Sequence, residues 1–299
     1  MKLPPRALVS LLASKSDWQI PQEKHLGILH DTGWSVSSKS SPDIQISACE
    51  KYPTMNDRIR TYMKDTFYKT APIPMALGLS KTSSCKETNE LVDKEIMDAI
   101  ESGASLLFTK LNDKGSSEIV GCWLNQIWTR NKSYDIIGAN ARLWHHAASE
   151  VVTMDENTNN NQHLLWRKLQ FLHIYDLGQV LLNQMPEKKF VVYLGAGFVD
   201  ERVRESDIMQ EAFHIIQNEW STRDCIIFMF TTFSKMEPYI QRRLNNPTVI
   251  DEMKYEDQTL EVDGVRCFKS CEHLGGIKFI VNFNKQGADN PDYNSYPSG

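Results

Sequence analysis

A short charged turn between a strand-like run and a helix-like run is the part of this sequence best suited to bind a ligand. Residues 190–194 are apolar and mostly β-branched or aromatic, and Gly195 and Gly197 after them indicate a bulge or an exit from the strand. Apolar residues then recur every three or four positions over 208–220, which predicts an amphipathic helix. Backbone N–H groups and the positive end of the dipole lie at a helix N-terminus, so the turn over 202–208 is a candidate anion site.

The charges in this turn leave two interpretations open. Glu205 and Asp207 would lie beside a bound anion, and like charges about 5 Å apart at an effective dielectric constant near 20 repel by roughly 3 kcal/mol before screening. In one interpretation these acids only complement the helix dipole, and no phosphate binds in the usual way. In the other, Arg202 and Arg204 neutralise the acids, and the backbone over 204–209 still holds a phosphate.

Metal chemistry has little support in the sequence. Cys267 and Cys271, with His273 nearby, form the only pair of cysteines at a suggestive spacing. A structural zinc site needs four ligands, and no second cluster completes this one. We therefore expect no metal site.

The elements around the turn alternate between strand and helix patterns. A glycine at 103 is placed to end a helix, and Asn112 to Gly115 is a hairpin signal. Pro72 and Pro74 are expected to stop the first helix. Strands are predicted at 44–51, 104–111, 119–129, 190–195, 225–231, 249–255 and 277–284, and helices at 56–67, 89–101, 162–185, 208–220 and 234–244.

Composition narrows the class of protein. The chain has 299 residues, a net charge of −5 and a pI near 5.9, which argues against a nucleic-acid-binding protein. No window approaches the roughly 18 apolar residues of a membrane span, and the dispersed cysteines fit a reducing compartment, so we expect a cytoplasmic protein. Polar ends suggest a flexible extension at 1–43, one domain at 44–286 and a disordered tail at 287–299.

Three stretches, in this order, resemble the GNAT acetyltransferases and, within them, the insect-type arylalkylamine N-acetyltransferases. They are TFYKTAPIPMALGL at 66–79, ESGASLLFTKLNDKGSSEIVGCWLNQIW at 101–128, and TTFSKMEPYIQRRL at 231–244 followed by DEMKYEDQTLEVDGVRCFK at 251–269. The likeness spans roughly 44–285. It implies an α/β (α+β) fold in which helices flank a mixed, mostly antiparallel sheet.

The resemblance also implies a cofactor and where it binds. Strands 190–195 and 225–231 should lie parallel and separate after Leu194, opening a V-shaped cleft for the pantetheine arm of acetyl-CoA. In the best superposition Arg204 lies on the arginine of the family's phosphate loop, and Glu205 and Asp207 replace its glycines. Residues that would bind the cofactor are Leu194, Gly195, Ala196, Arg202, Arg204, Glu205, Ser206, Asp207 and Ile208.

Catalytic residues carry over less completely. The family's glutamate base corresponds here to Ala71, which cannot accept a proton. Ser234 matches a serine that can act near the acetyl group, and Tyr239 a tyrosine that serves as general acid to the thiolate. Ser234 is explained more simply as the N-cap of its helix, and core packing explains Tyr239 equally well. Another group would have to act as the base, and the candidates are Glu50, Asp65 and His214.

Two functions follow from the resemblance. One is an acetyl-CoA-dependent N-acetyltransferase of a small amine, expected to be a monomer, in which Phe67, Tyr68, Trp123 and Trp128 would line an arylalkylamine pocket. The other is a GNAT-fold binding or regulatory protein that has lost the chemistry. Ala71 and the two acids of the turn favour the second function, and the rest of the likeness favours the first.

Overall fold

The computed structural model describes part of the chain, from the first strand to the last. The described residues are 35–49, 53–76, 79–81, 86–112, 115–130, 174–203, 207–221, 224–231, 240, 247–254, 261–262, 265–266 and 276–283. Nothing is stated below about the structure of the residues between and beyond these ranges.

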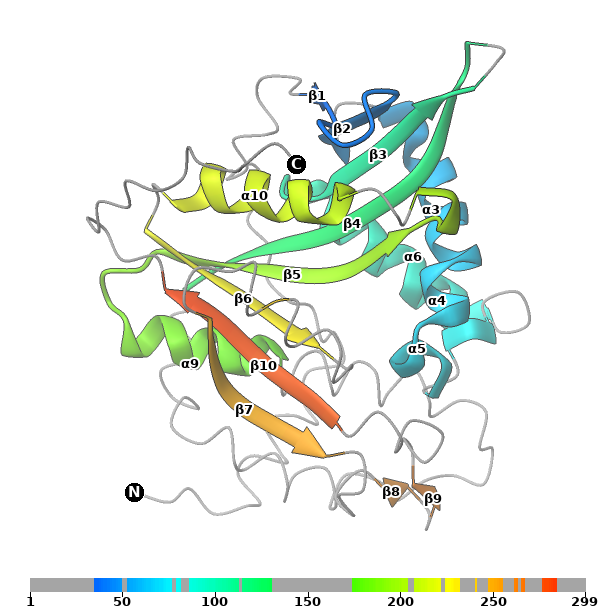
Figure 1. Ribbon diagram of the computed structural model, residues 1–299. Coiled ribbons are helices and arrows are strands. Elements are labelled where there is room, and N and C mark those ends of the chain that lie inside the picture. The colour runs from blue at the N-terminus through cyan, green and yellow to red at the C-terminus, as the bar shows by residue number, and fades with distance from the viewer. Residues whose placement is uncertain are drawn as a thin grey trace, which may run out of the picture.

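An eight-stranded sheet forms the centre of the molecule, and its strand order is β1-β2-β3-β4-β5-β6-β10-β7 (Figure 1). Only β5 and β6 pair in parallel, and all other neighbours are antiparallel, which confirms the predicted mixed, mostly antiparallel sheet. The strands are β1 (Ser35–Ser37), β2 (Ile44–Ala48), β3 (Leu106–Leu111), β4 (Ser117–Thr129), β5 (Phe190–Val199), β6 (Cys225–Thr231), β7 (Thr248–Lys254) and β10 (Gly276–Phe283). A separate hairpin pairs β8 (Glu261–Val262) with β9 (Val265–Arg266).

Helices cover the two faces of this sheet. The described α-helices are α3 (Asn56–Asp65), α4 (Phe67–Thr70), α5 (Pro72–Ala76), α6 (Lys86–Glu101), α9 (Asp176–Gln184) and α10 (Ile208–Ser221), with short 3-10 turns η2 (Pro53–Met55), η3 (Leu79–Lys81) and η7 (Glu201–Val203). The apolar residues of α3, α4, α6 and α9 join one buried cluster, whereas those of α10 join a second cluster. The two clusters take alternate residues of β4 and β5, so they lie on opposite faces of the sheet.

Several local predictions are confirmed. Gly103 follows α6 with φ of 76°, and Gly115 closes the β3–β4 hairpin with φ of 72°, a backbone conformation that glycine adopts without strain. In the hairpin the Gly115 N–H donates to the carbonyl of Asn112 at 2.8 Å, and the Asn112 N–H donates to that of Ser116 at 2.9 Å. These turns fix the register of the strands that follow them.

The proline-rich stretch differs from its prediction. The first helical segment ends before Pro72, as expected, but Pro72 then begins α5 instead of stopping helical structure. Ala71 is extended, with ψ of 138°, as favoured for a residue before proline, and proline fits the first turn of a helix because that N–H needs no partner there. The segment 56–76 is therefore three short helices in succession.

Several other helix and strand boundaries differ from the predicted ones. β5 does not end at the glycines but continues through Gly195 and Gly197 to Val199. α6 begins at Lys86, before the predicted start at 89, and the described part of the predicted helix 162–185 is α9. Residues 35–43, which the sequence assigns to the N-terminal extension, supply β1 and the turn into β2. No helix in the described ranges is long and apolar enough to cross a membrane.

Candidate active site

A bulge in β5 is the structural feature around which the candidate site is built. Leu194 pairs with Asn125 and Gly197 pairs with Trp123, so two β5 residues, Gly195 and Ala196, oppose one residue of β4. A Cβ built on Gly195 would lie 2.7 Å from the carbonyl oxygen of Leu124. Only glycine allows β5 and β4 to approach so closely, and this explains the residue type at 195.

The bulge also changes which side chains share a face. In an unbroken strand, residues two apart lie on the same face. Here Tyr193, Ala196 and Phe198 pack with the cluster of α3, α4, α6 and α9, whereas Leu194 and Val199 pack with the cluster of α10. The extra residue thus lets Tyr193 and Phe198 line the same side of β5.

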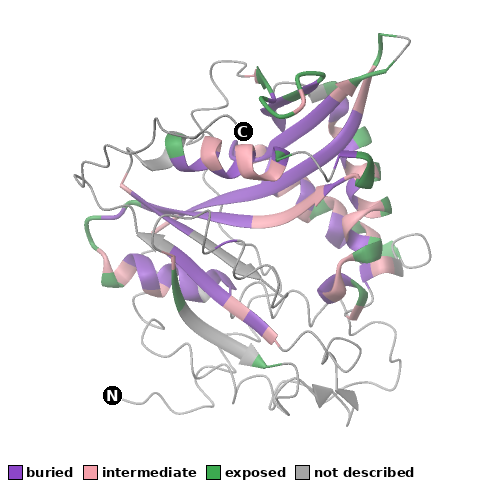
Figure 2. Ribbon diagram, in the orientation of Figure 1, coloured by how far each residue is buried: buried purple, intermediate pink, exposed green. Residues whose placement is uncertain are grey.

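The parallel pairing of β5 with β6 ends at the bulge. Its last pair within the described residues is Leu194 with Met229, although β5 continues to Val199. The two strands run from a common side and diverge toward their C-terminal ends (Figure 1). Residues 195–198 are only half-buried, in contrast to 190–194 (Figure 2). The predicted separation after Leu194 is confirmed.

Arg202, one of the predicted cofactor-binding residues, is already held by two carboxylates. Its guanidinium donates to Asp200 at 2.8 and 3.0 Å and to Glu118 at 2.9 Å. These hydrogen bonds raise the pKa of the guanidinium above its ordinary value, and the bonds accepted by Asp200 have the largest effect. The positive charge of Arg202 is therefore compensated by Asp200, just before η7, and by Glu118 of β4, and the interpretation in which Arg202 neutralises Glu205 and Asp207 loses support.

The other predicted cofactor-binding residues lie along β5 and at the start of α10. Asp207 is exposed, and its carbonyl accepts the Glu211 N–H at 2.9 Å, which places Asp207 at the helix N-terminus. The Ile208 side chain is fully buried in the α10 cluster, so only its backbone faces the turn. Leu194, Gly195 and Ala196 lie at the bulge, while Arg204, Glu205 and Ser206 lie outside the described residues.

The first turn of α10 is tied to the N-terminal strands. The Glu211 carboxylate accepts hydrogen bonds from the Ser38 hydroxyl at 3.1 Å and from the backbone N–H groups of Lys39 at 2.8 Å and Ser40 at 2.7 Å. Partial burial tends to raise the pKa of Glu211, but the hydrogen bonds from Ser40, Lys39 and Ser38 outweigh it and lower the pKa. The charged form of Glu211 thus fixes the β1–β2 turn against α10.

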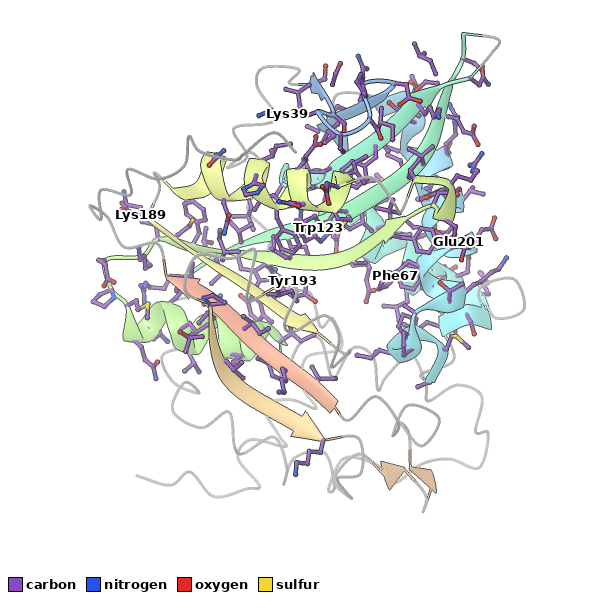
Figure 3. The ribbon with its side chains drawn as sticks, viewed as in Figure 1. Lys39, Phe67, Trp123, Lys189, Tyr193 and Glu201 are labelled. Atoms are coloured by element: carbon purple, nitrogen blue, oxygen red, sulfur yellow. The ribbon has the colours of Figure 1, made fainter. Side chains whose placement is uncertain are left out.

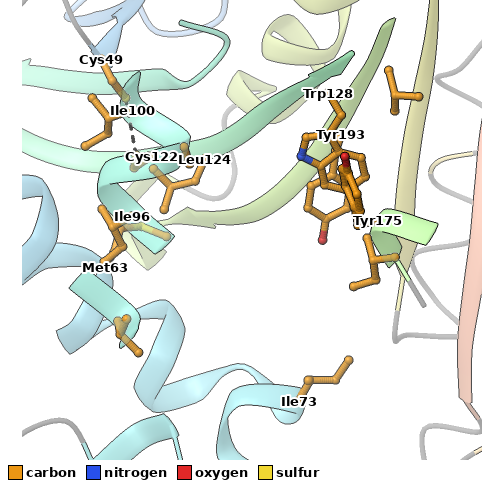
Figure 4. Packing of buried hydrophobic residues seen from close by; sticks show 14 of the residues in the cluster. Cys49, Met63, Ile73, Ile96, Ile100, Cys122, Leu124, Trp128, Tyr175 and Tyr193 are labelled. Carbon is orange, nitrogen blue, oxygen red and sulfur yellow. Dashed lines mark hydrogen bonds between the residues drawn. The ribbon is translucent and has the colours of Figure 1, made fainter. Parts of the chain in front are cut away.

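Aromatic side chains cover β5 on the face opposite α10. Trp128 and Tyr193 stack with ring centroids 4.7 Å apart, and Tyr175 packs edge-on against Trp128 at 5.3 Å (Figure 4). Farther along β5, Phe198 packs edge-on against Tyr62 of α3 at 6.1 Å. Helix α3 therefore lies over the half of β5 that has parted from β6.

The predicted aromatic pocket is divided between the two faces. Phe67, Tyr68 and Trp128 belong to the face of α4, but Trp123 packs edge-on against Phe213 of α10 at 4.5 Å. Figure 3 shows Trp123 on the α10 side of β5 and Tyr193 on the other side. Trp123 therefore cannot share a pocket wall with the other three, and that part of the prediction is wrong.

The predicted bases and acids are distributed as follows. Asp65 forms an ion pair with Lys69 at 2.5 Å on the exposed side of α3 and α4. His214 lies on α10, across the sheet from α4, so it does not lie on the face of Ala71. Glu50, Ser234 and Tyr239 lie outside the described residues, as do Cys267, Cys271 and His273. Within the described ranges no three His, Cys, Asp or Glu side chains are placed to hold a metal ion.

The sequence analysis missed Glu95, whose carboxylate contacts one of these aromatic residues. It lies on α6, and the Tyr68 hydroxyl donates to its Oε2 at 3.3 Å. A signal was present: Leu91, Ile96 and Ala99 are apolar and buried, and Glu95 lies between them on the inner part of the helix. A carboxylate inside an apolar stripe needs a polar partner, and that requirement could have identified it.

Comparisons with known proteins agree with this architecture. No protein-family model and no curated protein matches the sequence. Arylalkylamine N-acetyltransferase 2 from Aedes aegypti has a similar structure, with a TM-score of 0.54, 14% identity and coverage of 81% of this chain and 100% of that chain. An apo variant of agmatine N-acetyltransferase is similar with a TM-score of 0.53 and 12% identity, and the match covers 80% of this chain and 98% of that chain. A putative arylalkylamine N-acetyltransferase 7 from the yellow fever mosquito Aedes aegypti is similar with a TM-score of 0.50 and 13% identity, and the match covers 80% of this chain and 86% of that chain. At these identities the likeness concerns the fold, and this chain has the fold of the GNAT N-acetyltransferases.

Proposed function

We propose that this protein is an acetyl-CoA-dependent N-acetyltransferase that acts on a small amine, and we favour an arylalkylamine. The observation that carries the proposal is the coincidence of the Gly195 bulge with the last β5–β6 pair, Leu194 with Met229. Two parallel strands that part at a bulge make backbone N–H groups available for a ligand, and such groups can polarise a thioester carbonyl. Two proteins of similar structure, an agmatine N-acetyltransferase and an arylalkylamine N-acetyltransferase, are consistent with this chemistry.

The residues present fit one end of acetyl-CoA better than the other. At the bulge, Gly195 lacks the Cβ that would crowd the strand, and the backbone of buried Leu194 and of half-buried Gly195 and Ala196 would receive the acetyl end. At the turn, the phosphates would meet the backbone at the start of α10. Asp207 is negative there, and Arg202 is held by other acids, so we expect weak binding of the phosphates.

Aromatic rings beside the bulge support an arylalkylamine as the acceptor. Tyr68, Trp128 and Tyr193 lie on one face of the sheet, and flat apolar walls of this kind suit an aryl group. A protonated amine would also be attracted to the faces of such rings. The substrate would then approach from the side of α4 and α6.

Isothermal titration calorimetry with acetyl-CoA, followed by an acetylation assay with tyramine and agmatine, tests the proposal. We expect saturable binding of acetyl-CoA and faster acetylation of tyramine than of agmatine. Binding that is undetectable at millimolar acetyl-CoA would overturn the proposal. The second candidate function is a GNAT-fold binding protein without catalysis. It is favoured by one observation, which is that Ala71 replaces the family's glutamate. Binding of acetyl-CoA without turnover of any amine would support that alternative.

A further inference from the structure

A carboxylate and two phenols from three different elements meet beside the β5 bulge. Glu95 comes from α6, Tyr68 from α4 and Tyr193 from β5. Tyr68 donates to Glu95 at 3.3 Å, which is long for a hydroxyl donor, so the carboxylate is not locked by this bond. Tyr68 and Tyr193 are 3% and 5% exposed, whereas Glu95 is half-buried.

This cluster joins the two places that an acetyl transfer to an amine requires. Tyr68 lies one helical turn before Ala71, the position at which the base is missing. Tyr193 directly precedes Leu194, the last residue of β5 that pairs with β6. Glu95 therefore contacts, from a different helix, a side chain that lies one helical turn from Ala71.

Two other carboxylates of α6 form ion pairs with lysines. Asp93 forms an ion pair with Lys64 of α3 at 2.5 Å, and Asp98 pairs with Lys94 at 3.1 Å. From α4 and β5, the phenols of Tyr68 and Tyr193 face Glu95. Burial raises the pKa of both Tyr68 and Tyr193, and the charge of Glu95 raises it further, so both phenols stay protonated at neutral pH.

We propose that Glu95 is the general base of this protein, taking over the function that Ala71 cannot perform, and that Tyr68 positions its carboxylate. The inference rests on the proposed function. A small amine arrives as an ammonium ion, and the carboxylate of Glu95 takes one of its protons, directly or through one water. The neutral amine nitrogen then bonds to the carbonyl carbon of acetyl-CoA.

The remaining steps balance without a further reactant. When the tetrahedral adduct collapses, the C–S bond breaks and its electron pair leaves with sulfur. The second proton of the former amine passes to the thiolate, and Glu95 returns its proton to solvent. The net reaction converts an ammonium ion and acetyl-CoA into an N-acetylamine, CoA and one proton. Glu95 is unchanged after each cycle.

The substitution Glu95→Gln tests the proposal, because it removes the proton acceptor and keeps the size of the side chain. At pH 7 and saturating tyramine we expect kcat to fall by roughly 10²- to 10⁴-fold, the usual cost of losing a positioned base. KM for tyramine and the affinity for acetyl-CoA by calorimetry should change little. Above pH 7 the variant should gain about tenfold per pH unit toward the pKa of the amine, whereas the wild type should level off.

Asp98→Asn is the matched control, since it removes a carboxylate from the same helix whose partner is Lys94. It should keep the wild-type kcat and pH profile. Tyr68→Phe leaves the base in place but removes a donor to its charged form, so the pH at which the profile levels should rise. If Glu95→Gln does not fold, Glu95→Asp replaces it, with a smaller loss of kcat and a profile that still levels.

The outcomes separate this inference from the proposed function. If the wild type acetylates tyramine and Glu95→Gln does so within threefold, with the same pH profile, Glu95 is not the base and the proposed function stands. A rise in KM with unchanged kcat also overturns the inference, since it would assign Glu95 to amine binding alone. If the wild type does not bind acetyl-CoA, the proposed function fails and takes this inference with it.

Discussion

Replacing Gly195 with alanine tests the bulge on which the candidate site depends. The added Cβ would lie 2.7 Å from the carbonyl oxygen of Leu124 and 3.2 Å from a ring carbon of Tyr193. The first of these atoms belongs to the backbone of the paired strand and cannot rotate away. The second belongs to the ring that stacks on Trp128 at 4.7 Å. Alanine at 195 must therefore push β4 and β5 apart or turn the Tyr193 ring.

The expected size of the effect follows from this overlap. Adding a methyl group to a well-packed site typically costs about 1–3 kcal/mol. For a chain of 299 residues, about 2 °C of melting temperature corresponds to each kcal/mol, so the Gly195→Ala variant should melt roughly 2–6 °C below the wild type. Because the strain falls on residues 194–196, we expect acetyl-CoA affinity to fall by at least tenfold.

Gly197→Ala is the matched control. It makes the same change two residues along β5, where the nearest atoms are side-chain atoms of Trp123 at 3.2 Å and of Met209 at 3.5 Å. These can shift by a few tenths of an ångström, so the control should melt closer to the wild type. Differential scanning fluorimetry and calorimetric titration with acetyl-CoA provide both measurements. Equal melting temperatures and equal affinities in Gly195→Ala and the wild type would refute the role of the bulge.

Three further outcomes are expected. Replacing Glu205 and Asp207 together with glycine should strengthen acetyl-CoA binding by up to about a hundredfold at low salt, because roughly 3 kcal/mol of repulsion is removed; an unchanged or weaker affinity in calorimetry would show that the turn does not face the phosphates. Ala71→Glu, made in the Glu95→Gln background, should restore part of the acetylation rate near pH 7, and a rate that stays at the background level would argue against a shared region. The folded-state pKa of Glu211 is lowered, so its charge stabilises the fold at neutral pH, and this contribution is lost as the pH falls through that pKa. The Glu211→Gln variant should therefore have a lower melting temperature than the wild type at pH 7, and the difference should disappear below about pH 4. A difference in melting temperature that does not depend on pH would contradict the assignment.

Local sequence signals fixed much of the fold because each depends on a few neighbouring residues. The β3–β4 hairpin, the C-terminal glycine of α6 and the separation of β5 from β6 after Leu194 were all foreseen. The prolines were misjudged: Pro72 has a conformation that suits the first turn of a helix as well as the end of one. The chemistry of the proline alone could not decide between the two.

The candidate site was foreseen in part. Gly195 indicated a bulge, and the mixed charge of the turn at 202–208 was visible in the sequence. It was not visible that Asp200 and Glu118 take up the charge of Arg202, because Glu118 comes from a strand that is distant in sequence. The separation of Trp123 from Trp128 was visible in the sequence but was not used: they are five residues apart on a regular part of β4, and residues an odd number apart face opposite sides of a strand.

The sequence by itself determined the element order, the glycine at the bulge and the absence of a glutamate at 71, since residue type and spacing settle these. Only the tertiary structure decided which carboxylate stands near the bulge. The bulge adds one residue to β5, so Tyr193 and Phe198 share the face covered by α4 and α6. That packing brings Glu95 to Tyr68 across 27 positions of sequence. Contacts of this kind depend on how helices pack on a sheet and leave no periodic pattern along the chain.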